Sequence, residues 1–240
     1  MTQCENHIDG RSAIVLFSGG QDSTICLAWA LKNFNSVSTV GFFYGQRHAI
    51  ELECRGVILS KIIDIFPQWA SKLANDRLVD LDFFEQLSDS TLFMDREIEK
   101  TKEGLPNTFV PGRNIFFLTA TAALAYKSGI TNIIGGMCET DYSGYPDCRD
   151  ITLRSMEKTL SLGMECEFKI HTPLMFLDKA ASWSLAHQLG SDAFVDMIVE
   201  DTHTCYLGER EVRHSWGYGC GKCPACELRA KGFITYYSTL

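Results

Sequence analysis

The sequence has no long apolar run, and this excludes proteins that span a membrane by helices. No stretch approaches the roughly 18 apolar residues that a spanning helix needs. The first residues, Met1 to Arg11, are polar and carry two acidic side chains. They therefore lack the apolar region of a secretory signal peptide. We expect a cytoplasmic protein that has no membrane partner.

An excess of positive charge is also missing. The chain has 22 Lys and Arg residues against 30 Asp and Glu residues, which gives a formal net charge of −8. A protein that holds nucleic acid on its surface usually carries a basic face, because contacts with phosphate supply most of the affinity. The acidic balance argues against direct binding to a polynucleotide, although a local basic patch would be compatible with it.

What the chain does have is the size and composition of an ordinary globular protein. It has 240 residues, of which 45% are hydrophobic and 22% are charged. This suits one large domain, or one domain with a small appendage. Short apolar runs alternate with helical segments, which predicts an α/β fold with a doubly wound, mainly parallel sheet. The expected strands are Ala13–Phe17, Val37–Tyr44, Leu78–Leu81, Asn132–Met137 and Phe168–His171, and the expected helices are Ser23–Phe34, His48–Phe66, Asn114–Ser128, Ile151–Leu162 and Asp178–Leu189.

Two segments depart from this alternation. Residues from about Leu87 to Asn107 include many charged side chains, and their hydrophobic residues show no clear helical or strand periodicity. We therefore expect an insertion or a mobile loop there. From Thr202 onward, Gly, Cys and aromatic residues replace the helical pattern. We therefore expect a main α/β domain over residues 1–201 and a small C-terminal module over residues 202–240.

The segment from Ser18 to Thr24, S-G-G-Q-D-S-T, lies between an expected strand and an expected helix. Gly19 and Gly20 let the backbone turn tightly and approach a ligand closely. The start of the following helix offers free N–H groups and a positive dipole end, which together form an anion site. The hydroxyl groups of Ser18, Ser23 and Thr24 add further hydrogen-bond donors. The segment has neither the Gly-Lys-Ser/Thr ending of a Walker A loop nor the G-x-G-x-x-G pattern of a Rossmann loop.

Asp22 is the acidic residue of this segment. A carboxylate repels a bare phosphate, so we expect Asp22 to orient the loop or to help hold Mg²⁺ beside pyrophosphate. Either Asp22 or Ser23 could also cap the helix that follows.

The S-G-G-x-D-S pattern resembles the PP-loop ATP pyrophosphatases, which have an adenine-nucleotide alpha-hydrolase-like fold. In that family the loop grips the β- and γ-phosphates of ATP while a nucleophile attacks the α-phosphorus. The family includes ammonia and sulfur transferases, so the loop alone leaves the substrate open. The resemblance implies ATP, with Mg²⁺, as a co-substrate that contacts Phe17, Ser18, Gly19, Gly20, Gln21, Asp22, Ser23 and Thr24.

Four further segments gather polar and aromatic residues where expected strands end or expected helices begin. They are Phe43–His48, Val110–Asn114, Asp141–Arg149 and His171–Met175, with Lys179 just beyond the last. In a doubly wound sheet, ligands bind outside the carboxyl ends of the strands. We therefore expect these segments to surround one site.

The residue types in these segments suggest roles. Arg113 and Lys179 could neutralise phosphate or carboxylate charge. Tyrosines in the third segment could stack on a planar heterocycle, and its aspartates could accept hydrogen bonds from an amino-substituted ring. Each segment also has a plainer interpretation as turn chemistry or surface ion pairing. The catalytic candidates are Asp22, Arg113 and Lys179, and the substrate-binding candidates are Tyr44, Gln46, Arg47, Asp141, Tyr142, Tyr145 and Asp147.

In this order after S-G-G-Q-D-S, the segments Y-G-Q-R-H, V-P-G-R-N, D-Y-S-G-Y-P-D-C-R and H-T-P-L-M resemble the 7-cyano-7-deazaguanine synthase family, QueC. The resemblance runs from about Ile14 to Phe233. It implies an ATP-dependent ligase of queuosine biosynthesis that converts 7-carboxy-7-deazaguanine and ammonia to the nitrile, through an adenylated carboxylate and then an adenylated amide. It also implies a homodimer, and ammonia taken free or from another protein.

Two other functions remain open. A sulfur-inserting PP-loop enzyme that modifies tRNA would need a reactive cysteine or cluster near the loop, and usually a basic region for RNA. A non-catalytic nucleotide sensor or zinc-binding adaptor would keep nucleotide affinity without turnover, but the dense polar rim disfavours it.

The last 36 residues hold four of the ten cysteines. Cys220, Cys223 and Cys226 follow C-x2-C-x2-C spacing, and Cys205 lies upstream. This spacing lets neighbouring sulfurs reach one ion, and Zn²⁺ favours a closed tetrahedral site of four thiolates. An iron–sulfur cluster is the alternative. The family resemblance implies one structural zinc per chain, which would stabilise a tail too short to bury its own core.

Overall fold

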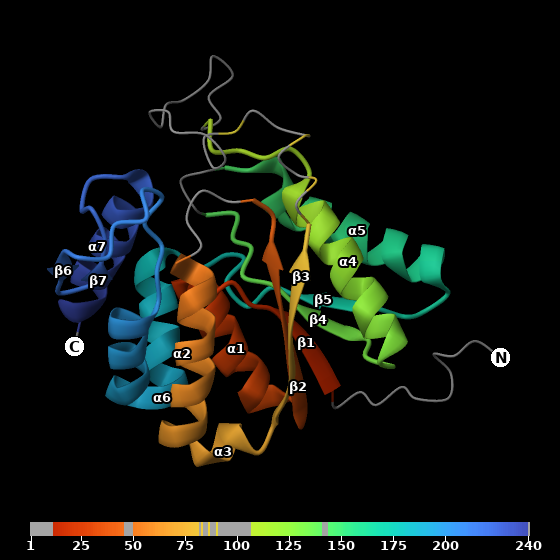
Figure 1. Cartoon of the computed structure of the whole chain (residues 1–240), viewed down its shortest axis with the longest axis horizontal. Coiled ribbons are helices and arrows are strands. Elements are labelled where there is room, and N and C mark those ends of the chain that lie inside the picture. Colours follow the sequence, from red (N-terminus) through yellow and green to blue (C-terminus); the bar gives the residue numbers. More distant parts are fainter. Residues whose placement is uncertain are drawn as a thin grey trace.

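The computed structural model describes residues 12–45, 50–81, 83, 86, 90, 107–140 and 144–239. A five-stranded sheet forms the centre of the molecule, in the order β3-β2-β1-β4-β5 (Figure 1). Every neighbouring pair in it is parallel, as the alternation of apolar runs predicts. Its strands are β1 (Ser12–Leu16), β2 (Ser36–Phe43), β3 (Leu73–Asp80), β4 (Asn132–Ile134) and β5 (Lys169–His171).

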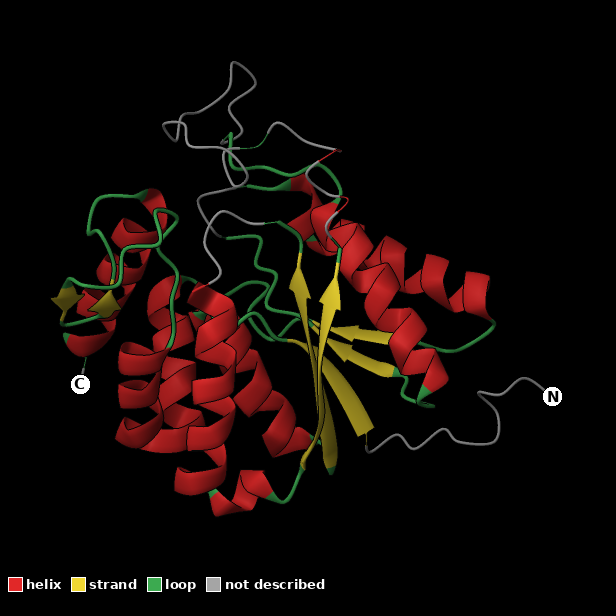
Figure 2. Ribbon diagram, viewed as in Figure 1, coloured by secondary structure: helices red, strands yellow, loops and turns green. Residues whose placement is uncertain are grey.

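Helices cover both faces of this sheet, so the fold is the predicted doubly wound α/β fold (Figures 1 and 2). On one face lie α1 (Gln21–Asn33), α2 (Ile50–Ile65), the short α3 (Pro67–Ala70) and α6 (Lys179–Asp201), and on the other lie α4 (Arg113–Lys127) and α5 (Asp150–Met164). The C-terminal segment adds an antiparallel pair, β6 (Arg213–His214) and β7 (Gly217–Tyr218), and α7 (Pro224–Tyr237), which packs on α6.

Each face of the sheet has its own hydrophobic core, and β1 contributes to both. Val15 packs in the core under α1, α2 and α6, while its neighbour Ile14 packs in the core under α4 and α5. Successive side chains of a strand point to opposite faces, so a strand buried on both sides is a continuous apolar run. This is why the sequence located β1 correctly.

The order of the strands reverses between β1 and β4. From β1 the chain adds β2 and β3 on one side, and it then crosses over to add β4 and β5 on the other. The crevice outside the carboxyl ends of strands at such a switch point is where doubly wound folds bind ligands. In Figure 1 the arrowheads of β2 and β3, which mark the carboxyl ends of these two strands, point toward the top of the view.

The start of α1 differs from the prediction. The helix begins at Gln21, its N-cap residue is Gly20, and no side chain caps it. The expectation that Asp22 or Ser23 caps this helix is therefore wrong. Both residues lie inside the first turn, where the hydroxyl of Ser23 instead accepts hydrogen bonds from the loop that precedes the helix.

Two elements extend well beyond their predicted bounds, and α7 and the short elements α3, β6 and β7 were not expected. Most residues of β3 are exposed, since it is an edge strand, and its first half lacks an apolar signal. Helix α6 continues beyond Leu189 across a kink at Gly190 and Ser191, whose backbone angles are not helical. Helix α7 was missed, although Pro224 occupies its first turn, as is common in helices. The segment from Leu87 to Asn107 lies almost wholly outside the described residues.

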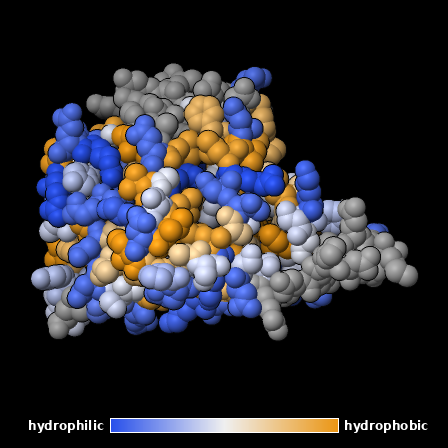
Figure 3. Space-filling model, turned by 60° about the horizontal axis from the view of Figure 1, so that its bottom comes forward, coloured by the Kyte–Doolittle hydropathy of each residue, from blue (hydrophilic) through white to orange (hydrophobic). Residues whose placement is uncertain are grey.

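The described surface is mixed in polarity. On the face drawn in Figure 3, hydrophobic residues gather over the middle and hydrophilic residues border them. Within the part of the chain that the structure describes, no helix is both long and apolar enough to cross a bilayer.

Candidate active site and metal centre

The loop from Phe17 to Gly20 leaves β1 and is fastened by hydroxyl groups of α1. Ser23 Oγ accepts hydrogen bonds from the N–H groups of Ser18 at 3.2 Å and Gly19 at 3.3 Å, and it lies 3.1 Å from the carbonyl oxygen of Gly20, to which it donates. Thr24 Oγ1 donates to the same carbonyl at 2.8 Å and is fully buried. These two hydroxyls hold the shape of the loop. Their expected contact with ATP stays a prediction.

Gly19 is required by close packing as well as by backbone conformation, and Gly20 is tightly packed. Gly19 has φ +94°, and a Cβ atom there would lie 2.1 Å from the carbonyl oxygen of Glu51. A Cβ atom on Gly20 would meet the carbonyl oxygen of His203 at 3.2 Å. The loop is thus enclosed by the start of α2 and by the segment that follows α6, and any side chain at Gly19 would displace them.

Asp22 and Lys179 form an ion pair beside this loop. Lys179 Nζ donates to Asp22 Oδ2 at 2.6 Å, and the two side chains are 11% and 25% exposed. Lys179 is the first residue of α6, whose N-cap Asp178 accepts a hydrogen bond from the N–H of Ala181 at 2.8 Å. Two of the three catalytic candidates therefore meet at the switch point, although they lie far apart in the sequence.

The third catalytic candidate, Arg113, begins α4 and contacts Tyr44 at the end of β2. Its guanidinium lies 5.7 Å from the centre of the Tyr44 ring, and Nη1 donates to Tyr44 Oη at 3.4 Å. Burial acts to lower the pKa of Arg113, but the nearby Tyr44 and Asp147 outweigh it and raise this pKa above its ordinary value. Burial also raises the pKa of the Tyr44 phenol. Arg113 therefore presents a permanent positive charge.

Two of the expected substrate contacts are occupied by interactions within the protein. Tyr145 is 8% exposed and stacks on Phe109, with ring centres 5.4 Å apart. Asp147 is 4% exposed, and its Oδ2 accepts a hydrogen bond from the N–H of Asn114 at 3.0 Å, in the first turn of α4. Asp147 supports the start of α4 and Tyr145 packs on the segment that precedes it, and their role toward a substrate stays a prediction. The other candidates Gln46, Arg47, Asp141 and Tyr142 lie outside the described residues.

Like Ser23 and Thr24, two further expected ATP contacts have buried side chains. Phe17 is 1% exposed, and the guanidinium of Arg55 lies 5.1 Å from the centre of its ring. Gln21 is also 1% exposed, and its amide group has no hydrogen-bond partner among the described residues. At Phe17 the ring belongs to the core, so contact with a nucleotide would fall to the backbone there.

Glu51 is a site residue that the sequence analysis missed. It lies in the first turn of α2, where its side chain forms a hydrogen bond with Ser18, and its Oε1 would lie 3.5 Å from a Cβ atom on Gly20. Burial raises the pKa of this carboxyl to about 7, and Asp22 adds to the rise, while Ser18 and Arg113 act in the opposite direction. The available signal was an acidic residue in the first turn of a helix that follows a strand end on the expected rim.

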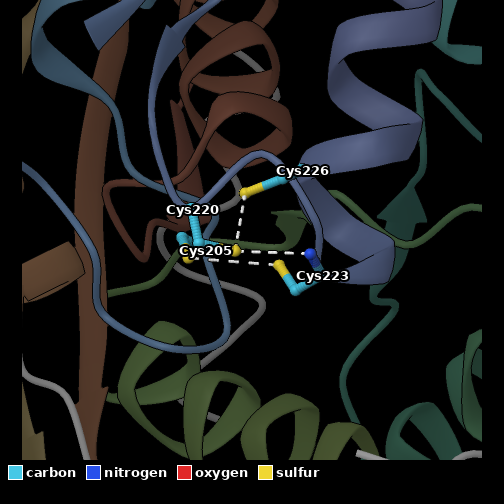
Figure 4. A group of neighbouring side chains, drawn as sticks. All are labelled: Cys205, Cys220, Cys223 and Cys226. Atoms are coloured by element: carbon cyan, nitrogen blue, oxygen red, sulfur yellow. Dashed lines mark hydrogen bonds between the residues drawn. The ribbon is translucent and has the colours of Figure 1, made fainter. Parts of the chain in front are cut away.

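The four expected metal ligands lie together in the C-terminal segment (Figure 4). The sulfur atoms of Cys205, Cys220, Cys223 and Cys226 all lie within 4.8 Å of one another, with 3.9 Å between Cys220 and Cys226 and 4.0 Å between Cys205 and Cys223. Four sulfurs at about 2.3 Å from a tetrahedral ion would be about 3.8 Å apart. The cluster therefore fits one metal ion.

The turns around this cluster leave no space for side chains. A Cβ atom on Gly219 would lie 2.6 Å from the sulfur of Cys226, and Gly221 has φ +72°. His214 stacks on Trp216 with ring centres 4.5 Å apart, and its Nε2 lies 2.9 Å from the carbonyl oxygen of Gly219. This histidine supports the turn.

Comparison with known proteins now identifies the family. A family model described as "Queuosine biosynthesis protein QueC" matches residues 12–237. The chain belongs to the QueC family. It is 59% identical over 226 residues to the 7-cyano-7-deazaguanine synthase of Nitrobacter hamburgensis. This match covers 94% of this chain and 95% of that protein. It is 60% identical over 227 residues to the enzyme of the same name from Azorhizobium caulinodans, with 95% and 94% covered.

The fold of this QueC chain also resembles that of a solved structure, a 4-thiouridine synthetase in complex with RNA and with bound ATP. The TM-score is 0.53 and the sequence identity is 16%, over 95% of this chain and 54% of that chain. At this identity the likeness shows a shared fold and nothing finer.

Proposed function

We propose that this chain is an ATP-dependent 7-cyano-7-deazaguanine synthase of queuosine biosynthesis, with 7-carboxy-7-deazaguanine and ammonia as its other substrates. The observation that carries the proposal is the identity of 59–60% with enzymes of this name over nearly the whole of both chains. The likeness to a 4-thiouridine synthetase is limited to the fold. Sulfur insertion into tRNA is therefore the weaker alternative.

The first step activates the carboxylate, which is a poor electrophile. One carboxylate oxygen attacks the α-phosphorus of ATP, the bond to the β-phosphate breaks, and pyrophosphate leaves. The start of α1 and the loop amides would hold the β- and γ-phosphates, since a helix N-terminus is a natural anion site. Lys179 and Arg113 supply the positive charges that stabilise the negative charge developing on phosphorus. The product is an acyl adenylate.

The second step makes the amide. The nitrogen of ammonia attacks the carbonyl carbon of the acyl adenylate, the bond between that carbon and the AMP oxygen breaks, and AMP leaves while one proton is released. The site must exclude water here, since water would return the acid. We propose that ammonia is taken from solution or delivered by another protein.

The third step activates the amide in the same way. The amide oxygen attacks the α-phosphorus of a second ATP, which releases pyrophosphate and one proton. Cleavage of the bond between carbon and the AMP oxygen, with loss of a second proton from nitrogen, then gives the nitrile and AMP. Each bond change occurs on substrate and ATP, so the enzyme needs no covalent nucleophile.

Metal ions have two proposed roles. Mg²⁺ would accompany ATP near Asp22, whose buried Oδ1 has no hydrogen-bond partner among the described residues and is a suitable oxygen ligand. Zn²⁺ is the proposed occupant of the four-cysteine cluster, because four thiolates at tetrahedral spacing suit this ion. In that closed site it would be structural.

The organisation of the protein completes the proposal. We propose a PP-loop domain over residues 1–201 and a metal-binding module over residues 202–240, in a cytoplasmic homodimer that does not bind nucleic acid directly. A mass equal to one chain in light scattering would contradict the dimer. Tight, salt-sensitive binding of tRNA would instead favour the alternative function.

Mass spectrometry of the base tests the reaction itself. The protein is incubated with 7-carboxy-7-deazaguanine, ATP, Mg²⁺ and ¹⁵N-labelled ammonium. We expect the amide first and then the nitrile, each with one labelled nitrogen, together with AMP and pyrophosphate. Absence of both products from a folded, metal-loaded protein would overturn the proposal.

A further inference from the structure

The four-cysteine cluster lies close in sequence to two residues, His203 and Gly232, that contact the phosphate-binding end of the candidate ATP site. Cys205 lies two residues after His203, and Cys226 lies six residues before Gly232 in α7. Each of these neighbours touches a different part of the candidate ATP site.

The first contact runs through the backbone of His203. Its N–H lies 3.4 Å from the carbonyl oxygen of Gly19, to which it donates, and its own carbonyl oxygen would be 3.2 Å from a Cβ atom on Gly20. His203 is 2% exposed. The chain between α6 and the cluster therefore lies directly against the loop.

The second contact runs through α7. Gly232 is buried, and a Cβ atom there would lie 2.4 Å from Cβ of Lys179 and 2.9 Å from its carbonyl carbon. Such distances do not occur between real atoms, so a glycine is needed for α7 to reach Lys179. Cys226 is in the first turn of the same helix, about 9 Å along its axis from Gly232.

A buried guanidinium joins the two contacts. Arg229 of α7 is 1% exposed, and it donates to the carbonyl oxygen of Ile198 in α6 at 2.9 Å and to Thr204 Oγ1 at 3.2 Å. Thr204 lies between His203 and Cys205 in the sequence. The module, α6 and the segment after α6 are thus fastened as one unit.

We propose that the four-cysteine module is a brace for the ATP site, which holds Gly19 through His203 and sets the position of Lys179 through Gly232. Gly232 is then a positioning residue: it makes no contact with nucleotide, but it fixes the lysine that pairs with Asp22. This inference rests on the proposed ATP-dependent function, and it assigns the module a role beyond closing the fold.

The test is the affinity of Gly232→Ala for Mg²⁺-ATP and for pyrophosphate, measured by calorimetry on metal-loaded protein. The added methyl group forces α7 and the start of α6 apart by about 1 Å, and a shift of that size at Lys179 is enough to break a 2.6 Å hydrogen bond. We expect affinity for both ligands to fall at least tenfold. The matched control is Gly163→Ala in α5, another helical glycine, where a Cβ atom would meet nothing within 4 Å.

A double-mutant cycle separates positioning from general damage. In a Lys179→Ala background, Gly232→Ala should weaken binding less than twofold further, because the ammonium group whose position it would change is gone, while the Cβ atom and backbone of residue 179 remain. A full additional loss would overturn the proposal, and so would unchanged affinity in the single variant. Wild-type protein that binds neither ligand would instead overturn the proposed function.

A milder variant covers the case in which Gly232→Ala does not fold. Thr204→Val removes one hydrogen bond to Arg229 with little change in volume. We expect at least threefold weaker pyrophosphate binding at full metal content. Unchanged affinity in this variant would likewise overturn the brace.

Discussion

Lys179 Nζ lies 2.6 Å from Asp22 Oδ2 and so joins the first residue of α6 to the first turn of α1. The pair places one negative and one positive charge beside a loop suited to phosphate. Because both residues sit at the starts of helices, the fold fixes the separation of the two side chains before a ligand arrives.

Replacement of Lys179 should damage chemistry more than folding. We expect Lys179→Ala to lower kcat/KM for ATP by about 100-fold, or about 2.7 kcal/mol, because a cation near the reacting phosphorus stabilises the transition state. Initial-rate measurement of pyrophosphate release checks this. Lys72→Ala is the control. Lys72 lies just before β3, at the opposite edge of the sheet, and its Nζ donates to the carbonyl oxygen of Leu31. Equal rates in the two variants would remove Lys179 from the catalytic set.

Loss of one cysteine ligand should remove the metal. We expect Cys226→Ser to lower the metal content from about one ion per chain to near zero and to lower the unfolding temperature, because binding of the ion contributes to folding. Elemental analysis and calorimetry measure the two effects. Cys54→Ala changes a buried cysteine outside the cluster and should keep the ion. Full metal content in Cys226→Ser would contradict the four-ligand site.

Glu51 should make stability depend on pH. Its pKa of about 7 in the folded protein lies above the ordinary value of about 4.3, so the folded state keeps a proton that the unfolded state releases between these values. The free energy of unfolding should fall as pH rises through this window, by up to about 4 kcal/mol. Glu51→Gln should lose this slope and be the more stable protein at pH 8.

Urea unfolding at several pH values measures the effect of Glu51. Glu53→Gln is the control for loss of a charge, since Glu53 is exposed and lies in the same turn of α2. A wild-type profile parallel to that of Glu51→Gln between pH 4.5 and pH 7 would show that the folded protein does not raise this pKa.

Arg55 should be a strong determinant of stability. Its side chain is 4% exposed, and it donates to the carbonyl oxygen of Phe17 and to the carboxylate of Asp76. We expect Arg55→Met to cost about 2–3 kcal/mol, because the carbonyl of Phe17 loses its buried donor, while the carboxylate of Asp76, which is 43% exposed, keeps Thr39 as a donor. Urea unfolding measures this cost. Arg154→Met on α5 should cost much less, since its ion pairs are partly exposed, and a similar loss in both would contradict the argument.

Much of the fold could be predicted from the sequence, and the failures have physical causes. Strands buried on both faces, such as β1, are unbroken apolar runs, whereas the exposed edge strand β3 was found only at its end. Helix α7 was missed because the Gly and Cys residues of the last segment obscure its helical pattern of hydrophobic residues. The kink at Gly190 concealed the second half of α6.

In the candidate site, too, some features could be predicted from local motifs, and others depend on tertiary packing. Local motifs identified the loop from Ser18 to Thr24 and the cysteine cluster, because chain neighbours form a turn or a metal knuckle with little help from elsewhere. Glu51 carries no motif, and only the packing of α2 against the loop places it there. Burial also changed the expectation for Phe17, whose ring belongs to the core.

The sequence by itself determined the chemistry available to this protein: a phosphate loop at the end of a buried strand, four thiolates at metal spacing, and the family to which both belong. Only the tertiary structure decided which groups act together. Asp22 meets Lys179 because the sheet and its crossovers bring the starts of α1 and α6 together, and Lys179 meets Gly232 because α7 packs on α6. Contacts between residues so far apart depend on packing, which no local pattern of residues encodes.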